Sequence, residues 1–426
     1  MQRMALIGLV CLLAGCGPRN PGEQSFDPAE YGKLAGLKAS GNLQLRDELA
    51  RIADEGGTPE QLGRCDVPEE ENAAVALRAV FPPQKVKSLW EASEKIDPPR
   101  GFAFDPIRLQ KAIRFRTQHE PERRKAQEAL SRPKCAFAIP FHIGYYADAS
   151  FGEGVRLCAR LEAFRAAESL ADGDVTAAID SLTRMLRLAA CLAAEKHIVP
   201  RLDAVQIRTG AFAVLQSIVK HEKFSRRHLD RVAELVAEQW KAWPSDAAAW
   251  IGDRALGMYA YEMVRAGQLI RLLTDSDIER FHEERILAEM SDAARRVADT
   301  DELFYLDAMR RIIESCGRPY YERAAVFDAI DAELRSREDT PEYPLVAARL
   351  LLPKIRDGHA VQARDRANWQ AWMLALALAT GRNPLPYRVN PLSGKPYQSA
   401  KHGQGVEVRG VGTSADDDSP IELPIP

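Results

Sequence analysis

The sequence predicts a mainly α-helical fold of antiparallel helical hairpins or a bundle, followed by a small C-terminal β-hairpin or meander. Three observations support this prediction. Apolar residues recur at intervals of three and four from about residue 43 to residue 381, which is typical of amphipathic helices. Gly, Pro and Asp separate these runs by short links, so neighbouring helices should be antiparallel. After Arg382 the sequence becomes rich in Pro and Gly and shows strand-like alternation.

The N-terminus has the features of a secretory signal. It has a basic start at Arg3, an uncharged apolar run over residues 5–13, and small residues immediately before Cys16. The apolar run is far shorter than the roughly 20 residues that a membrane-spanning helix needs. We therefore expect residues 1–15 to be a signal peptide.

The end of this segment, Leu13-Ala14-Gly15-Cys16, resembles the lipobox of bacterial lipoproteins. The resemblance implies cleavage between Gly15 and Cys16 and a diacylglycerol thioether on Cys16, a reaction for which a thiolate is the nucleophile. The membrane would then be a partner through the lipid on Cys16, because two or more acyl chains give stable anchoring. An ordinary signal peptide with an incidental cysteine is the alternative.

Residues 16–24 read as a flexible leash, because Gly17, Pro18, Pro21 and Gly22 prevent a regular helix or strand. By the same resemblance, Gly17 after the cysteine favours the outer membrane, with the body in the periplasm. The 58 basic and 61 acidic residues nearly cancel, to a net charge of −3. This balance gives no basic face, so we expect no nucleic-acid partner.

The helical sequence divides into two parts. Residues 25–134 form an N-terminal helical part that is broken by several prolines, and residues 135–385 form a helical-hairpin body. The aromatic segment 135–154 reads as a connector laid over the core, whose aromatic side chains can line a groove. Further amphipathic helices are expected at residues 154–170, 175–192, 205–219, 226–243, 250–273, 277–297, 303–315, 323–335 and 344–380.

One hairpin of the body resembles a tetratricopeptide repeat. Ala166 is the small residue of the first helix, Gly173-Asp174 forms the turn, and Leu182 lies on the apolar face of the second helix. The turn needs a residue that tolerates positive φ, and Asp172 or Asp174 can cap the second helix. We find one copy at this spacing, whereas a solenoid needs about three.

The chain has seven cysteines. Removal of Cys11 with the signal and lipidation of Cys16 leave an odd number, so at least one thiol is free. We expect most of them in the core, and a disulfide between Cys158 and Cys191 across the hairpin stays open. The remaining cysteines are Cys65, Cys135, Cys158, Cys191 and Cys316.

The segment "WKAWPSDAAAW" has the most unusual local composition of the body. Its three indoles, Trp240, Trp243 and Trp250, can form a hydrophobic or glycan-binding wall. They can also staple two helices on either side of the turn that Pro244 begins. We favour the staple, because aromatic side chains dominate core packing.

Residues 386–426 form the tail, in which Val406 and Val408 alternate with Glu407 and Arg409 as in a half-buried strand. The tail is too short to have its own core and must pack on the helices. With "NPLSGKPY" at residues 390–397, "GVEVRGVG" and "ADDDSPIEL", it resembles the tail of an uncharacterised group of bacterial lipoproteins of planctomycete type. The resemblance implies a helical body and assigns no activity.

The same tail distantly resembles the C-terminal calcium loop of type II secretion major pseudopilins. The resemblance places Asp416, Asp417 and Asp418 at the position of the calcium ligands. Calcium takes six to eight oxygens, however, and three consecutive aspartates cannot all point at one ion. The Asp-Gly turn of that family is also replaced by residues 413–415. A solvated acidic turn is the favoured interpretation, and calcium is the one cofactor that stays open.

The sequence contains none of the common catalytic motifs. The H-E-x-x-H zinc pair, the G-x-S-x-G elbow, the P-loop and a dinucleotide-binding glycine motif are all missing, so no catalytic residue is predicted. Our first hypothesis is a lipid-anchored helical interaction or scaffold protein of the cell envelope that binds a protein or peptide. The alternatives are an envelope hydrolase whose site forms only in three dimensions, and a structural component of a secretion or pilus-like system.

Overall fold

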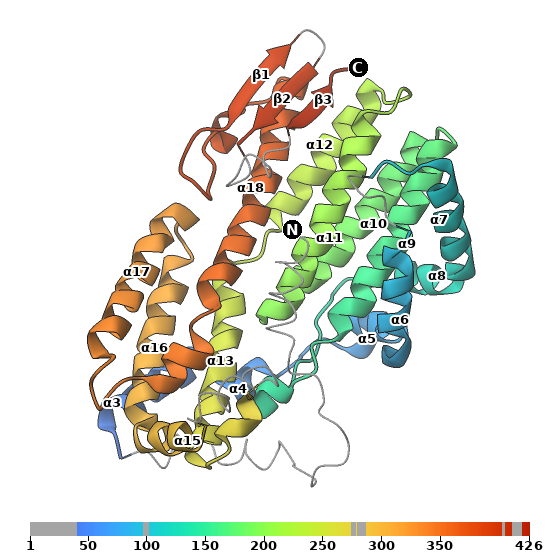
Figure 1. Ribbon diagram of the computed structural model, residues 1–426. Coiled ribbons are helices and arrows are strands. Elements are labelled where there is room, and N and C mark those ends of the chain that lie inside the picture. Colours follow the sequence, from blue (N-terminus) through green and yellow to red (C-terminus); the bar gives the residue numbers. More distant parts are fainter. Residues whose placement is uncertain (1–40, 97–101, 274–277, 279–286, 403–404, 411–419) are drawn as a thin grey trace.

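The structure is a computed structural model that describes residues 41–96, 102–273, 278, 287–402, 405–410 and 420–426 (Figure 1). Helices make up most of it, and a three-stranded antiparallel sheet follows the last helix. The predicted fold class, mainly α with a small C-terminal β element, is thereby confirmed.

The N-terminal part consists of short helices whose starts are set by prolines and polar caps. Pro59, Pro83 and Pro106 each occupy the first position of a helix, where the missing N–H of proline costs nothing. Helices α5 to α8 pack on the long helix α9 of the body, whereas α3 packs on α16. The helices of this part are α3 (Leu43–Asp54), α4 (Pro59–Leu62), α5 (Ala73–Arg78), α6 (Pro83–Glu94), α7 (Pro106–Gln118) and α8 (Glu120–Ala129).

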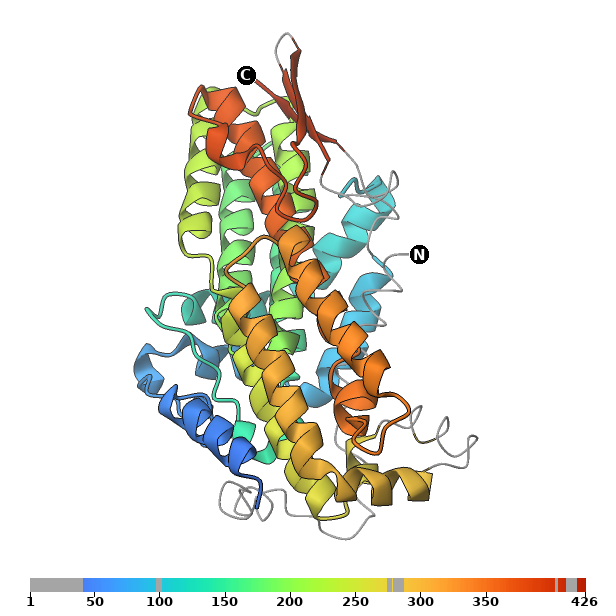
Figure 2. The same cartoon turned by 90° about the vertical axis from the view of Figure 1, so that its left-hand side faces the viewer.

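The body begins with antiparallel helices that lie side by side in Figures 1 and 2. They are α9 (Phe151–Ala171), α10 (Val175–Ala193), α11 (Ile198–Val219) and α12 (Arg226–Lys241). At the turn from α9 to α10, Gly173 has a φ of +73°, and the Asp174 side chain accepts a hydrogen bond from Ala177 N at 2.9 Å. The predicted turn and cap are confirmed, with Asp174 as the capping residue.

A second group of helices has its own apolar core around Trp250, Tyr261 and Met309. It comprises α13 (Asp246–Arg265), α15 (Leu287–Arg296), α16 (Ala298–Ser315) and α17 (Tyr320–Arg337). The long helix α18 (Ile355–Thr380) contacts α17 in this group and also α11 and α12 of the first group. Helix α18 therefore joins the two cores, as its length along the molecule in Figure 1 shows.

Several helix boundaries differ from the prediction, as where α11 starts at Ile198 rather than at residue 205, and two of the differences have a local cause. The run expected over residues 250–273 starts earlier, at Asp246, and ends at Arg265, because Gly267 with a φ of +72° terminates it. The run expected over residues 344–380 is divided into a π-helical turn, Ala347–Leu351, and α18. Pro353 lies between them, and its missing N–H interrupts the helical hydrogen bonds.

The C-terminal sheet is a meander in the order β1-β2-β3, with β1 (Gln398–His402), β2 (Gly405–Arg409) and β3 (Ile421–Pro424). Val408 pairs with Ser399 on one side and with Ile421 on the other. Val406 and Val408 are buried, and β2 and β3 contact α18. The predicted strand around Val406 and its packing on the long helix are therefore confirmed.

The "NPLSG" motif forms a turn that fastens the sheet to the helices. The Asn390 side chain is buried, accepts a hydrogen bond from Leu392 N at 2.8 Å and donates one to the carbonyl of Gly410. Tyr320 N, at the start of α17, donates to Pro391 O at 2.9 Å. The motif that carries the family resemblance thus has a structural role in this chain.

The disulfide left open between Cys158 and Cys191 does not form. Both thiols are free, and Cys158 is buried inside the first core. The Cys191 side chain instead interacts with Cys135, in the segment that follows α8. The spacing across the α9–α10 hairpin left this pairing open, but Cys158 lies within the core whereas Cys191 lies at its edge.

Among the described helices, none combines the length and the apolar character that crossing a bilayer would require.

Candidate functional site

The structure divides the three tryptophans singled out in the sequence. Trp240 and Trp243, at the end of α12, have ring centroids 5.6 Å apart, and Trp243 meets Trp369 of α18 edge to face at 5.7 Å. Trp250 lies in the second core, where it stacks on His359 at 4.1 Å. Trp240 and Trp243 thus belong to one aromatic cluster, and Trp250 does not.

The Trp243 side chain borders a cavity of about 50 Å³ between α10, α11, α12 and α18. Alanines on α10 and α12 leave this space, because their short side chains do not fill it. We call this cavity the Trp243 pocket. It is lined by Leu186, Ala190, Ala193, Ala194, Arg208, Gln239, Ala242, Trp243, Pro244 and Trp369.

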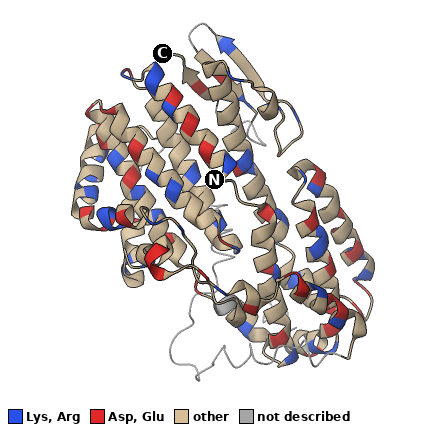
Figure 3. Ribbon diagram, turned by 180° about the vertical axis from the view of Figure 1, so that it is seen from behind, with Lys and Arg blue, Asp and Glu red and all other residues tan. Residues whose placement is uncertain are grey.

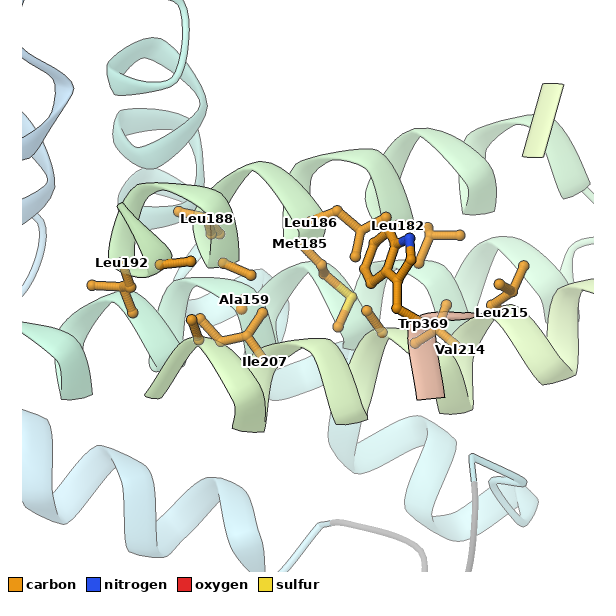
Figure 4. Close-up of a cluster of buried hydrophobic side chains, with 14 of the residues drawn as sticks. Ala159, Leu182, Met185, Leu186, Leu188, Leu192, Ile207, Val214, Leu215 and Trp369 are labelled. Atoms are coloured by element: carbon orange, nitrogen blue, oxygen red, sulfur yellow. The ribbon is translucent and has the colours of Figure 1, made fainter. Parts of the chain in front are cut away.

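The apolar core beside the Trp243 pocket holds its indole wall in place. Trp369 lies among Leu182, Leu186, Val214 and Leu215 (Figure 4). Its indole Nε1 donates a hydrogen bond to the carbonyl oxygen of Val236 in α12 at 3.2 Å. A buried indole with its N–H satisfied has little freedom to move, so this wall is preformed.

The polar wall of the Trp243 pocket is a buried ion pair. Arg208 of α11 donates through Nε to Asp365 Oδ2 at 2.8 Å, and its Nη2 lies 2.5 Å from the same oxygen. The guanidinium also sits over the Trp243 ring, 4.6 Å from the centroid. Burial raises the pKa of Asp365, and the positive charge of Arg208 opposes that rise. The wall of the pocket therefore contains a cation that is held by a carboxylate and by an indole ring.

A second cation, Arg366, lies beside the same aromatic cluster. Its guanidinium is 5.5 Å from the Trp240 ring centroid and 3.7 Å from the carboxylate of Asp246. Each of the two indoles of α12 is thus paired with an arginine from a neighbouring helix. Such pairs combine apolar packing with a cation–π attraction.

The size of the Trp243 pocket limits what it can hold. Sites for cofactors and drug-sized ligands have volumes of roughly 300–1,000 Å³. A cavity of about 50 Å³ accommodates a small group such as one short side chain. Its indole and alanine walls suit an apolar body, while Arg208 and Gln239 suit a hydrogen-bond acceptor.

A second group of polar side chains is closed to solvent. Arg323 of α17 donates to Asp246 at 2.9 Å and to the carbonyl of Cys316 at 2.8 Å, and its Nη1 lies 3.3 Å from His359 Nδ1. Burial lowers the pKa of His359 well below its usual value, and Arg323 lowers it further. Arg323 is 2% exposed and His359 is fully buried, so this cluster joins α13, α17 and α18 rather than facing a substrate.

The other predicted site residues fall outside the described part of the chain. Gly15 and Cys16 of the lipobox-like segment lie in residues 1–40, and the candidate calcium ligands Asp416, Asp417 and Asp418 lie in residues 411–419. Within the part that is described, no three His, Cys, Asp or Glu side chains are grouped as a metal site would require.

No protein-family model, curated protein or solved structure matches the chain. The fold and the site define an α-helical protein with a C-terminal meander and a small aromatic pocket that has an arginine in its wall.

Sequence reasoning missed Arg208, Gln239 and Asp365 as residues of the site. The available signal was the position of Arg208 and Asp365 within otherwise apolar helical runs, since buried charges are normally paired. That signal identifies each residue as unusual but does not identify its partner.

Proposed function

We propose that the protein is a lipid-anchored cell-envelope protein whose helical body binds a protein or peptide partner. The Trp243 pocket is the observation that carries the binding role. It offers two indole walls, a fixed guanidinium and a volume suited to one short side chain. Binding pockets combine apolar walls with a few placed polar groups in this way.

The tether in this proposal is the lipid on Cys16. Its support is the lipobox-like Leu13-Ala14-Gly15-Cys16 and the Pro- and Gly-rich leash that follows. The first described helix begins at Leu43, so the chain between Cys16 and the body can serve as a spacer from the membrane. In this arrangement the body lies in the periplasm, below the outer membrane.

The chemistry of the pocket favours an acidic or carbonyl-bearing side chain of the partner. A guanidinium has five N–H donors, and Arg208 directs two of its nitrogens at one oxygen of Asp365. The other N–H groups of Arg208 can therefore donate to an acceptor on the partner's side chain. The indoles of Trp243 and Trp369 would then surround the carbon atoms of that side chain. Positively and negatively charged residues alternate along the helices in Figure 3, which is consistent with recognition by the pocket itself.

The hydrolase hypothesis ranks second. It requires ionisable groups with shifted pKa values that a substrate can reach. In the cluster of Asp246, Arg323 and His359, the group whose pKa is shifted is His359, and its side chain is fully buried. A role in a secretion or pilus-like system has only the resemblance of the tail in its support. The interaction role is therefore the one that a feature of the body favours.

In-cell cross-linking tests the binding role. The photo-reactive substitution Ala242→p-benzoylphenylalanine places a probe at the exposed rim of the pocket. We expect a discrete partner to be captured, and capture to be lost when Ala194→Leu fills the pocket. The matched control is Ala171→Leu, at an exposed position on α9. Capture that is equally strong in the Ala194→Leu variant would show that the pocket is not the binding site.

Fractionation tests the tether separately. Replacing the lipidation residue, Cys16→Ser, should release the protein from the membrane fraction or leave the signal uncleaved, as read by intact mass. Unchanged membrane association together with normal cleavage would contradict the lipid anchor and leave the pocket experiment unaffected.

A further inference from the structure

One face of α10 lies along the segment that leads from α8 into the body. Arg187 and Cys191 are four residues apart on α10 and so share a face, and Glu195 follows shortly after the helix ends at Ala193. Arg187 Nη2 donates to Leu130 O at 2.7 Å, and Glu195 Oε1 accepts from Phe137 N at 2.8 Å. These two bonds hold residues 130–137 in a fixed register beside α10.

Cys135 and Cys191 meet between those two bonds. The two thiols interact with each other side chain to side chain, at the place where the flanking hydrogen bonds bring residues 130–137 beside α10. Both side chains are half-buried on the surface of the first core, whereas Cys158 and Cys316 are buried. The hydrogen bonds on either side of the pair fix the backbone around both residues. A disulfide between them should therefore need little backbone movement.

The surroundings also activate one of the two sulfurs. The interaction with Cys135 lowers the pKa of Cys191, burial opposes this, and the positive charge of Arg187 lowers it further. The same interaction raises the pKa of Cys135, as does burial. Because the thiolate is the nucleophile in disulfide chemistry, Cys191 is the sulfur that reacts first.

We propose that Cys135 and Cys191 are a disulfide-forming pair that closes when the chain meets a disulfide oxidant. The Cys191 thiolate attacks one sulfur of the oxidant disulfide and releases its other sulfur as a thiol. The Cys135 thiolate then attacks the Cys191 sulfur of this mixed disulfide and displaces the second oxidant thiol. The pair loses two protons and two electrons, and the oxidant disulfide is reduced to two thiols.

The bond would fix the N-terminal part to the body. The residue after Cys135, Ala136, is held by Asn72, which donates to Ala136 O at 2.8 Å and accepts from Ala136 N at 3.0 Å. A covalent link at Cys135 therefore reaches α5 through Asn72 and α10 through Cys191. Cross-linking across the 135–191 loop restricts the unfolded chain and should stabilise this junction.

An exposed thiol provides the competing reaction. The Cys65 sulfur lies 3.8 Å from the carbonyl oxygen of Ala136, beside the same segment. A bond between Cys65 and Cys135 would use the same Cys135 sulfur and so compete with the proposed bond. Peptide mapping distinguishes the two bonds, because they join different pairs of peptides.

The experiment uses the purified protein, from whichever cell fraction contains it, equilibrated in glutathione buffers of stepped redox poise. After alkylation of free thiols, peptide mapping should show a Cys135–Cys191 link that appears with oxidation, with the loss of two hydrogen masses. The oxidised protein should melt at a higher temperature than the reduced protein. Cys135→Ser and Cys191→Ser should each abolish both effects, whereas Cys158→Ser should keep them.

Two results would overturn the proposal: alkylated Cys135 and Cys191 at every redox poise, or a dominant Cys65–Cys135 link. The supply of oxidant in the cell rests on the proposed envelope location. The glutathione titration does not depend on that location, so it can succeed or fail independently of the Cys16→Ser fractionation.

Discussion

Arg208 of α11 and Asp365 of α18 form a buried ion pair although they are 157 positions apart in the sequence. The pair joins the first group of helices to the helix that spans both cores. The same guanidinium lies over Trp243 and lines the pocket. The side chain that forms this ion pair therefore also lines the Trp243 pocket, and its position is fixed by a helix that follows much later in the chain.

Replacing the cation alone should be costly. Arg208→Met leaves the Asp365 carboxylate buried without its partner, which typically destabilises a fold by about 3–5 kcal/mol. Urea unfolding of the purified protein at pH 7 measures this loss. The double variant Arg208→Met with Asp365→Leu replaces both charges with apolar groups and should recover much of the stability. A single variant as stable as the unaltered protein would show that the pair contributes little.

His197 should make the fold sensitive to acid. It is buried, and burial lowers its pKa from 6.5 to about 4. Its Nδ1 accepts a hydrogen bond from Val199 N at 3.0 Å at the start of α11, which an imidazolium cannot do. Because the folded pKa is depressed, this stabilisation is present above pH 6.5 and is lost as the pH falls toward 4. Between pH 8 and pH 5 the loss is about 2 kcal/mol.

The variant His197→Asn isolates this effect, because Asn keeps an N-cap acceptor but does not titrate. Other buried groups also titrate between pH 8 and pH 5. Burial raises the pKa of Glu195 to about 7, which acts in the opposite direction, so only the difference between the two proteins is informative. Unfolding free energies measured from pH 8 to pH 5 should diverge in favour of the variant. Parallel curves would contradict a neutral His197.

The helices could be predicted because their causes are local. The apolar spacing of α10, the glycine at its turn and the cap at Asp174 all lie within one stretch of sequence, and the strand around Val408 shows its own alternation. The division of the 344–380 run was also a local matter, set by Pro353, and the apolar pattern obscured it because it continues on both sides of the proline.

The site could not be predicted in the same way. Trp243 was recognised as unusual, but its neighbours Arg208 and Trp369 come from other helices, and the cavity is a consequence of small residues on α10 that have no special pattern. The cysteine pairing failed for the same reason. Sequence spacing suggested Cys158 for Cys191, whereas the register of an irregular segment beside α10 brings Cys135 there instead.

Gly252 should be intolerant of any side chain. A Cβ at this position of α13 would lie 1.5 Å from the backbone oxygen of Lys196, which cannot rotate away. Gly252→Ala should therefore destabilise the protein by about 3 kcal/mol, the upper end for overpacking. Gly154→Ala is the matched control, since a Cβ there meets no atom within 4 Å. The control should be neutral or gain up to about 1 kcal/mol in helix propensity. Equal melting temperatures for the two variants would refute the close approach.

The C-terminal sheet should contribute to the stability of the body. Val408 is fully buried where β2 lies against α18, and Val406 and Leu423 are buried beside it. Val408→Ala removes two buried carbon atoms at about 0.8 kcal/mol each and leaves a cavity, for a total loss of about 2 kcal/mol. Val389→Ala, at a site 48% exposed, is the control and should change little. Thermal unfolding of both variants measures the difference.

Deletion of residues 387–426 should lower the melting temperature further, because it uncovers the apolar surface of α18 that the sheet covers. A truncated protein that melts with the full chain would mean that the sheet is an independent arm, and a partner could then bind there rather than at the Trp243 pocket.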